Sequence, residues 1–315
     1  TIGANANALE TSAGTLVIAG YGDTVATPVA TGAVNVKETD ALTIQSVNAA
    51  SVNLVIGGNT DVLSLTASGA VSMDVTGGLS VQTLSGTDVT LKASGALSDG
   101  DSGTDTLDIT ATNLVINAAS VGTSGNALET SAGTLVIAGY NGTSATGAVN
   151  VTETDALTIE NVNAASVNLV IGGNTDVLSL TASGAVSMDV TGGLSVQTLS
   201  GTDVTLKASG ALTDGDVVDA QNADTVDITA TNLVINAASV GTIGANANAL
   251  ETSAGTLVIA GYNTSATGAV NVKETNELTI ANVNAASVNL VAGGNTDVLS
   301  LTASGAVSMD VTGGL

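Results

Sequence analysis

Two stretches of this sequence gather carboxylates in the manner of a metal-binding loop. SDGDSGTDTLD ends at Asp108, TDGDVVDAQNADTVD ends at Asp227, and both contain Asp-Gly-Asp. Oxygen-rich loops with a glycine are typical of calcium sites. Neither stretch matches the calcium nonapeptide GGxGxDxUx or an EF-hand loop, and their later acids are spaced differently, so the pattern favours two solvated loops over specific calcium sites. The candidate ligands for a weakly bound calcium are Asp99, Asp101, Asp105, Asp214, Asp216 and Asp219.

Other chemistry is limited by the residue types that the chain lacks. It has no His, Cys, Trp or Phe, and its four basic residues are all lysines. Without histidine no ordinary serine triad can form, and without cysteine there is no thiol–metal chemistry. Paired carboxylates that hydrolyse sugars normally rely on aromatic or basic neighbours, which this chain does not supply. We therefore predict that the protein is not an enzyme and has no catalytic residues and no organic cofactor.

The charge of the chain restricts its partners. Four lysines stand against 28 acidic residues, giving a formal net charge of −24, while 44% of the residues are hydrophobic. So few cations cannot neutralise a phosphate track or hold an anionic membrane surface. No run approaches the roughly 18 apolar residues of a membrane-spanning helix. We predict no nucleic-acid binding and no membrane insertion, but a folded chain, because disordered acidic chains are poor in aliphatic residues.

The elements that must position these acids belong to a long repeat. Val47–Leu97 and Val162–Leu212 are the same string, and Val283–Leu315 runs through it again with one change, at Ala292. The phrase ALETSAGTLVIAGY occurs three times, with its glutamate at Glu10, Glu129 and Glu251. A fixed period of this length indicates a tandem array. We expect one continuous repeat array over residues 1–315, with copies at approximately 1–122, 123–241 and a truncated 242–315.

A shorter rhythm runs inside each copy. Short apolar–polar runs start every 8 to 10 residues, separated by Gly-Gly, Ser-Gly and Asn-containing turns. In the run Ala70–Val75, the alternation places Val71, Met73 and Val75 on one face, as in a half-buried strand. We likewise expect Ile56, Met188 and Met309 to point inward. Asn48, Asn163 and Asn284 are expected to form amide ladders at corners.

Two architectures fit strands at this spacing, a set of antiparallel sandwiches and a β-solenoid. The solenoid is favoured because aromatics are almost absent and no proline-rich linkers separate the copies. The three tyrosines, one per copy, are expected to cover a corner: Tyr21, Tyr140 and Tyr262. We predict an all-β parallel β-helix (β-solenoid) with about 18–20 residues per rung and two strands per coil, stacked into one elongated shaft.

A family resemblance adds to this prediction. The strings NALETSAGTLVIAG, GAVNVTETDALTI and SVNAASVNLV resemble the repeats of filamentous-haemagglutinin-like giant bacterial exoproteins. The resemblance implies a right-handed parallel β-helix shaft, an extracellular or bacterial cell-surface location, and a structural role in adhesion, cell contact or matrix formation. The expected partners are other copies of the chain, end to end or side by side in filaments, and cell-surface or matrix glycans. The alternatives are a calcium-dependent adhesin of tandem β-sandwich repeats and, more distantly, a β-helical polysaccharide-active enzyme or an ice-binding solenoid.

Overall fold

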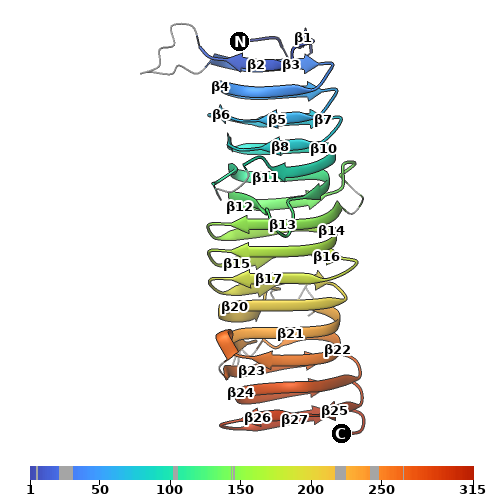
Figure 1. Cartoon of the computed structure of the whole chain (residues 1–315). Coiled ribbons are helices and arrows are strands. Elements are labelled where there is room, and N and C mark those ends of the chain that lie inside the picture. Colours follow the sequence, from blue (N-terminus) through green and yellow to red (C-terminus); the bar gives the residue numbers. More distant parts are fainter. Residues whose placement is uncertain are drawn as a thin grey trace. The chain divides into compact units, whose positions relative to one another are not determined.

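The chain forms two compact units, Thr1–Asp155 and Ala156–Leu315, which are described separately. Within each unit the strands pair in parallel with the strands of the next coil (Figure 1). No helix of the described part is long and apolar enough to cross a membrane. The computed structural model describes residues 1–4, 6–20, 31–101, 106–142, 144, 146–216, 225–241, 248–264 and 266–315.

The first unit is built from short strands in succession. Its strands are β1 (Leu9–Thr11), β2 (Thr15–Ile18), β3 (Thr31–Glu38), β4 (Leu42–Ile56), β5 (Thr60–Val62), β6 (Leu65–Ala67), β7 (Val71–Val75), β8 (Leu79–Val81), β9 (Leu84–Ser85), β10 (Asp88–Asp99), β11 (Ile109–Val121), β12 (Leu128–Ala138) and β13 (Thr146–Glu153).

The second unit repeats this order. It contains β14 (Leu157–Ile171), β15 (Thr175–Val177), β16 (Leu180–Ala182), β17 (Val186–Val190), β18 (Leu194–Val196), β19 (Leu199–Ser200), β20 (Asp203–Asp214), β21 (Ile228–Val240), β22 (Leu250–Ala260), the 3-10 helix η1 (Tyr262–Thr264), β23 (Thr267–Glu274), β24 (Leu278–Ala292), β25 (Thr296–Val298), β26 (Leu301–Ala303) and β27 (Val307–Val311).

The predicted rung length is confirmed in the regular coils. Leu42 pairs with Thr60 and Val52 pairs with Val71, so register partners lie 18 and 19 residues apart. Coils that carry loops are longer: Leu84 pairs with Ile109, 25 residues on. The predicted parallel β-helix is therefore the fold of each unit, with extra residues added to particular coils.

The expectation of two strands per coil is wrong, because one regular coil is the single long strand β4 and the next has the three strands β5, β6 and β7. The long strand β4 pairs with β5, β6 and β7 along successive parts of its length. Within the sequence DVLSL of residues 61–65, Val62 and Leu65 are both buried while Leu63 is exposed. Two inward residues three positions apart cannot lie on one flat strand, so the chain bends between β5 and β6.

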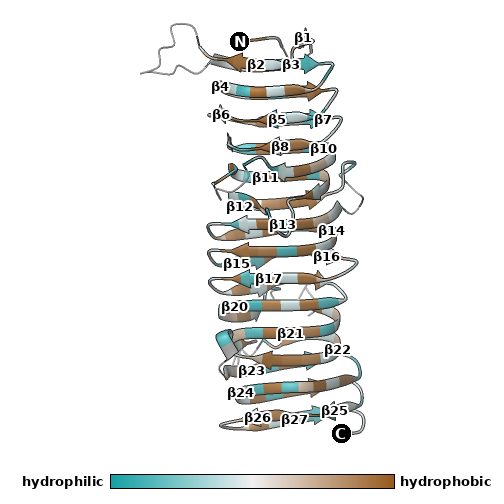
Figure 2. Cartoon of the chain, viewed as in Figure 1, coloured by the Kyte–Doolittle hydropathy of each residue, from teal (hydrophilic) through white to brown (hydrophobic). Residues whose placement is uncertain are grey.

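The interior consists of aliphatic side chains stacked in register. In the first unit Leu54, Met73, Leu91, Ile116 and Ile137 follow one another from coil to coil. Each is at most 1% exposed, and such burial contributes about 1.5–3 kcal/mol per side chain. Apolar and polar residues alternate along the strands in Figure 2 accordingly.

The other residues predicted to point inward follow the same pattern. Ile56 and Met188 are buried, and Ala292 is fully buried at the position equivalent to Ile56. Met309 is half-buried, in the last coil of the sequence.

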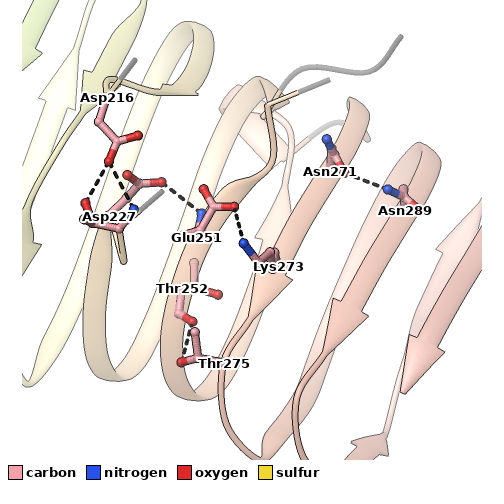
Figure 3. A network of polar contacts seen from close by, with 9 residues as sticks. Asp216, Asp227, Glu251, Thr252, Asn271, Lys273, Thr275 and Asn289 are labelled. Carbon is pink, nitrogen blue, oxygen red and sulfur yellow. Dashed lines mark hydrogen bonds and ion pairs between the residues drawn. The ribbon is translucent and has the colours of Figure 1, made fainter. Parts of the chain in front are cut away.

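The prediction that Asn48, Asn163 and Asn284 form amide ladders is wrong. The next coil places a threonine, not an asparagine, beside each of Asn48, Asn163 and Asn284. An amide ladder exists instead between Asn289 and Asn271, whose Nδ2 and Oδ1 atoms are 2.7 Å apart (Figure 3). These two asparagines are register partners in adjacent coils.

Candidate metal centre

The first acidic stretch forms the neck of an inserted segment. In one coil, residues 82 and 83 connect β8 to β9, while in the next coil nine residues, 100–108, separate β10 from β11. Asp99 ends β10 beside Val81, and Asp108 directly precedes β11. We call Asp99, Asp101, Asp108 and the adjacent Glu129 the first neck. One carboxylate oxygen from each of Asp99, Asp101 and Asp108 lies within 4.8 Å of the others.

Hydrogen bonds hold these carboxylates in place. The Asp101 N–H donates to Asp99 Oδ1 at 2.7 Å, and the Thr106 hydroxyl donates to Asp101 Oδ2. The Glu129 N–H donates to Asp108 Oδ2 at 3.0 Å. The second oxygens, Oδ1 of Asp101 and Oδ1 of Asp108, are buried and accept no hydrogen bond from the described residues. Asp108 is 0% exposed, so its Oδ1 is removed from bulk water as well.

The first neck favours the protonated form of Asp108. Burial raises the pKa of Asp108 to about 8, and the negative charges of Asp99 and Glu129 and a side-chain hydrogen bond with Glu129 add to this rise. The hydrogen bond from the Glu129 N–H acts in the opposite direction. Burial dominates because a carboxylate loses most of its hydration in such a place.

The second acidic stretch forms an equivalent neck in the second unit. Asp214 pairs with Val196 and Ile228 pairs with Leu199, so the inserted segment here is residues 215–227. One carboxylate oxygen from each of Asp214, Asp227 and Glu251 lies within 4.8 Å of the others. We call these three residues and Asp216 the second neck.

The hydrogen bonds of the second neck copy those of the first. The Asp216 N–H donates to Asp214 Oδ1 at 2.8 Å. The Glu251 N–H donates to Asp227 Oδ2 at 2.9 Å (Figure 3). Thr225 donates to Asp216 Oδ2 from its N–H and its hydroxyl, at 3.3 and 2.7 Å. Oδ1 of Asp216 and Oδ1 of Asp227 again accept no hydrogen bond within the described part of the chain. The same hydrogen bonds therefore occur in both units. The clustered carboxylates differ, because the second cluster contains Glu251 and the first contains Asp101.

Charge differs between the two necks. Burial raises the pKa of Asp227, which is 0% exposed, to about 9, with further increases from Asp214, Glu251 and Asp216. Lys273, in the next coil, reaches Glu251 with 3.4 Å between Nζ and Oε1 (Figure 3). At the first neck, Thr152 stands beside Glu129 in the position that Lys273 holds beside Glu251.

The structure brings together part of the predicted ligand set. Asp99, Asp101, Asp214 and Asp216 all lie in the necks, while Asp105 and Asp219 fall outside the described residues. Sequence reasoning did not choose Asp108, Asp227, Glu129 or Glu251 as ligands. The signal for the two aspartates was the shared ending Thr-x-Asp-Ile-Thr, and the glutamates are their partners one coil later.

Not every buried acid in the chain has an oxygen without a partner. Glu153 Oε2 accepts from the Thr130 hydroxyl at 2.8 Å and the Ala132 N–H at 2.9 Å, and Oε1 accepts from the Asp155 N–H at 3.0 Å. Glu274 makes the same set of contacts in the second unit. Burial raises the pKa of both glutamates. These residues fasten one coil to the next and are structural.

Glu38 has the equivalent place in the first copy. Its Oε2 accepts from the Thr11 hydroxyl and the Ala13 N–H. Burial pushes its pKa upward, but the hydrogen bonds outweigh that effect and hold the pKa below the usual range.

One tyrosine spans the outer surface of the first unit. Asp74, Lys92, Asn117 and Ala138 follow one another in register across four coils. Tyr140, two residues beyond Ala138, donates its hydroxyl to Asp74 Oδ1 at 2.9 Å. This hydrogen bond is the main reason that the pKa of Tyr140 is raised. Tyr140 thus covers strand faces as well as a corner, and Tyr21 lies outside the described residues.

Comparison with known proteins adds no relative: no family model, no curated protein and no solved structure matches this chain. The class that the fold defines is a long parallel β-sheet protein of the β-solenoid type.

Proposed function

We propose that the chain is a structural segment of an extracellular fibre. In this proposal it is the stiff shaft of a giant bacterial surface or secreted protein that serves adhesion, cell contact or matrix formation. The observation that supports it most is the regular stacking of parallel coils around aliphatic columns in both units. The proposed location and biological role rest on the likeness of its repeats to those of filamentous-haemagglutinin-like exoproteins.

Stiffness in this proposal comes from main-chain hydrogen bonds that run between coils. Bonds such as Val52 N–H to Ala70 C=O and Val167 N–H to Ala185 C=O, both 3.0 Å, recur at equivalent points of the two units. Because every coil must pair its backbone groups with its neighbours, bending the stack breaks several bonds at once. The number of copies then sets the length, and the acidic surface repels neighbouring shafts at low ionic strength.

The parallel pairing also bears on the alternative adhesin. Tandem antiparallel sandwiches are not compatible with the parallel strand pairs of either unit. A calcium-dependent adhesin of that architecture is therefore not proposed again.

A length series tests the mechanical part of the proposal. Chains with one, two and three copies of the repeat would be imaged by electron microscopy. We expect a constant width and a length that rises by the same step with each copy, at about 4.8 Å per coil. A width that grows with copy number would contradict the proposal.

The biological part needs a separate test. Antibodies against this chain should label intact source cells or their secreted matrix without permeabilisation. Labelling only after permeabilisation would contradict the extracellular location. A glycan array and a hydrolysis assay on the same glycans should show binding without turnover.

A further inference from the structure

We propose that each neck binds one Ca²⁺ ion, the first through Asp99, Asp101 and Asp108 and the second through Asp214, Asp227 and Glu251. This inference does not depend on the proposed fibre function. It assigns two specific cation sites per chain, in place of diffuse binding to an acidic surface.

The first argument is the state of the buried oxygens. Asp108 and Asp227 are both 0% exposed, and Oδ1 of each accepts no hydrogen bond from the described residues. A buried carboxylate oxygen without a partner is costly, and native proteins rarely keep one without an ion or water to satisfy it. In each neck this oxygen belongs to a carboxylate that lies among other carboxylates, where a cation would satisfy it.

The second argument is repetition. The inserted segments differ in length, 100–108 against 215–227, yet the aspartates at their ends keep the same hydrogen bonds. If the segments were only solvated loops, repulsion between the carboxylates would not favour the same close arrangement of aspartates in both necks. A shared ligand in each neck would remove the repulsion between these carboxylates.

The geometry and the donor set favour calcium. Ca²⁺ binds six to eight oxygens at about 2.3–2.6 Å in flexible geometry, so oxygens on opposite sides of the ion lie about 5 Å apart. The three carboxylate oxygens of each neck lie within 4.8 Å of one another, which fits one such ion, with water for the remaining positions. Mg²⁺ demands a smaller and nearly ideal octahedron. Zinc prefers nitrogen and sulfur ligands, and this chain has neither histidine nor cysteine.

A bound ion would join three parts of the chain in the second unit. Asp214 comes from the end of β20. Asp227 precedes β21 and Glu251 lies in β22 (Figure 3). Calcium would therefore fasten both ends of the inserted segment to the following coil.

Isothermal titration calorimetry on the full chain tests the proposal. The protein would be stripped of metal with a chelator and titrated with calcium chloride at pH 8 in 150 mM NaCl. We expect saturation at two ions per chain. Asp108→Asn should remove one site, Asp227→Asn the other, and the double variant both. Asparagine keeps the oxygen that accepts the Glu129 or Glu251 N–H, and circular dichroism would confirm that each variant folds.

The matched control changes the same charge elsewhere. Asp61 and Asp176 are exposed and occupy equivalent positions in the two units, so Asp61→Asn with Asp176→Asn should leave both sites intact. The proposal is overturned if the wild type shows no saturable binding at this salt concentration. It is also overturned if the double neck variant binds like the control, or if Mg²⁺ binds as tightly as Ca²⁺.

Discussion

The two necks share their hydrogen bonds but differ in which carboxylates lie together and in charge. Both place a fully buried aspartate against the N–H of a glutamate one coil later. The second neck adds an ion pair from Lys273 to Glu251, whereas Thr152 stands at this point beside the first neck. The register between coils therefore determines where the carboxylates lie, while the residue beside the glutamate in the following coil, Lys273 or Thr152, changes the net charge of the neck. We therefore expect the first neck to bind calcium more tightly than the second.

Glu10 and Lys37, from the first copy, show what the same pair does in water. Their charged atoms are 3.9 Å apart, and their side chains are 77% and 56% exposed. An ion pair this exposed contributes little to the stability of the fold. The Glu251 side chain is only 5% exposed, so the charge of Lys273 matters more at the second neck.

The largest expected effect is that of pH on calcium binding, because protons compete with the ion for the buried aspartates. The pKa of Asp108 is raised to about 8 and that of Asp227 to about 9. From pH 6 upward, the affinity of each site should rise by about tenfold per pH unit for one competing proton. The first neck should level off near pH 8 and the second near pH 9. Calorimetry on Asp227→Asn and Asp108→Asn separates the two profiles, and identical or flat profiles would contradict this difference.

Exchanging the residues that distinguish the necks should have the next largest effect. Lys273→Thr should strengthen calcium binding at the second neck, and Thr152→Lys should weaken it at the first, each by about tenfold. Lys37→Thr removes the same charge from the exposed pair and should leave both affinities within about twofold. Titrations of the three variants check this. Unchanged affinities for Lys273→Thr and Thr152→Lys would show that the adjacent coil does not set the charge of the neck.

A smaller effect is expected on the stability of the metal-free protein. The pKa values of Asp108 and Asp227 are higher in the folded chain than the ordinary value of 3.8. The folded state therefore holds more protons than the unfolded state above pH 4, and its stability should fall as the pH rises toward 9. Thermal melts in chelator should show a decrease of a few degrees, and the decrease should be much smaller for Asp108→Asn with Asp227→Asn. A melting temperature that rises over this range in the wild type would contradict the prediction.

The smallest effect concerns the surface of the first unit. Tyr140→Phe removes the hydrogen bond to Asp74 and should lower the free energy of unfolding by about 1 kcal/mol. Urea unfolding measures this value. The loss should disappear when Asp74→Ala, which removes the accepting oxygen, is already present, and a double-mutant cycle would show this. An equal loss in both backgrounds would mean that the tyrosine ring, and not its hydroxyl, stabilises this surface.

Local patterns in the sequence were enough to predict the strands and much of the core. Val71, Met73 and Val75 point inward as the alternation indicates, because the side-chain period of a strand depends on neighbouring residues only. The bend between β5 and β6 could not be predicted. Leu63 is an apolar residue on the outside of this bend, and in the sequence it looks like the continuation of a strand.

The candidate site needed information that spacing does not contain. Asp99 and Asp101 were found because the Asp-Gly-Asp signal is contiguous. Asp108 and Glu129 meet only through register across an insertion, so their separation in sequence does not reveal their contact. The difference in length between the two insertions made the later acids look unrelated.

The inserted segments show where this repeat tolerates added sequence. Register resumes after each of them, with Leu84 beside Ile109 and Leu199 beside Ile228, although the second segment is longer. The interior columns are therefore independent of how many residues separate the two neck aspartates. A foreign peptide spliced into either corner, between the neck aspartates, would be displayed at a defined point of the coil without disturbing the packing behind it.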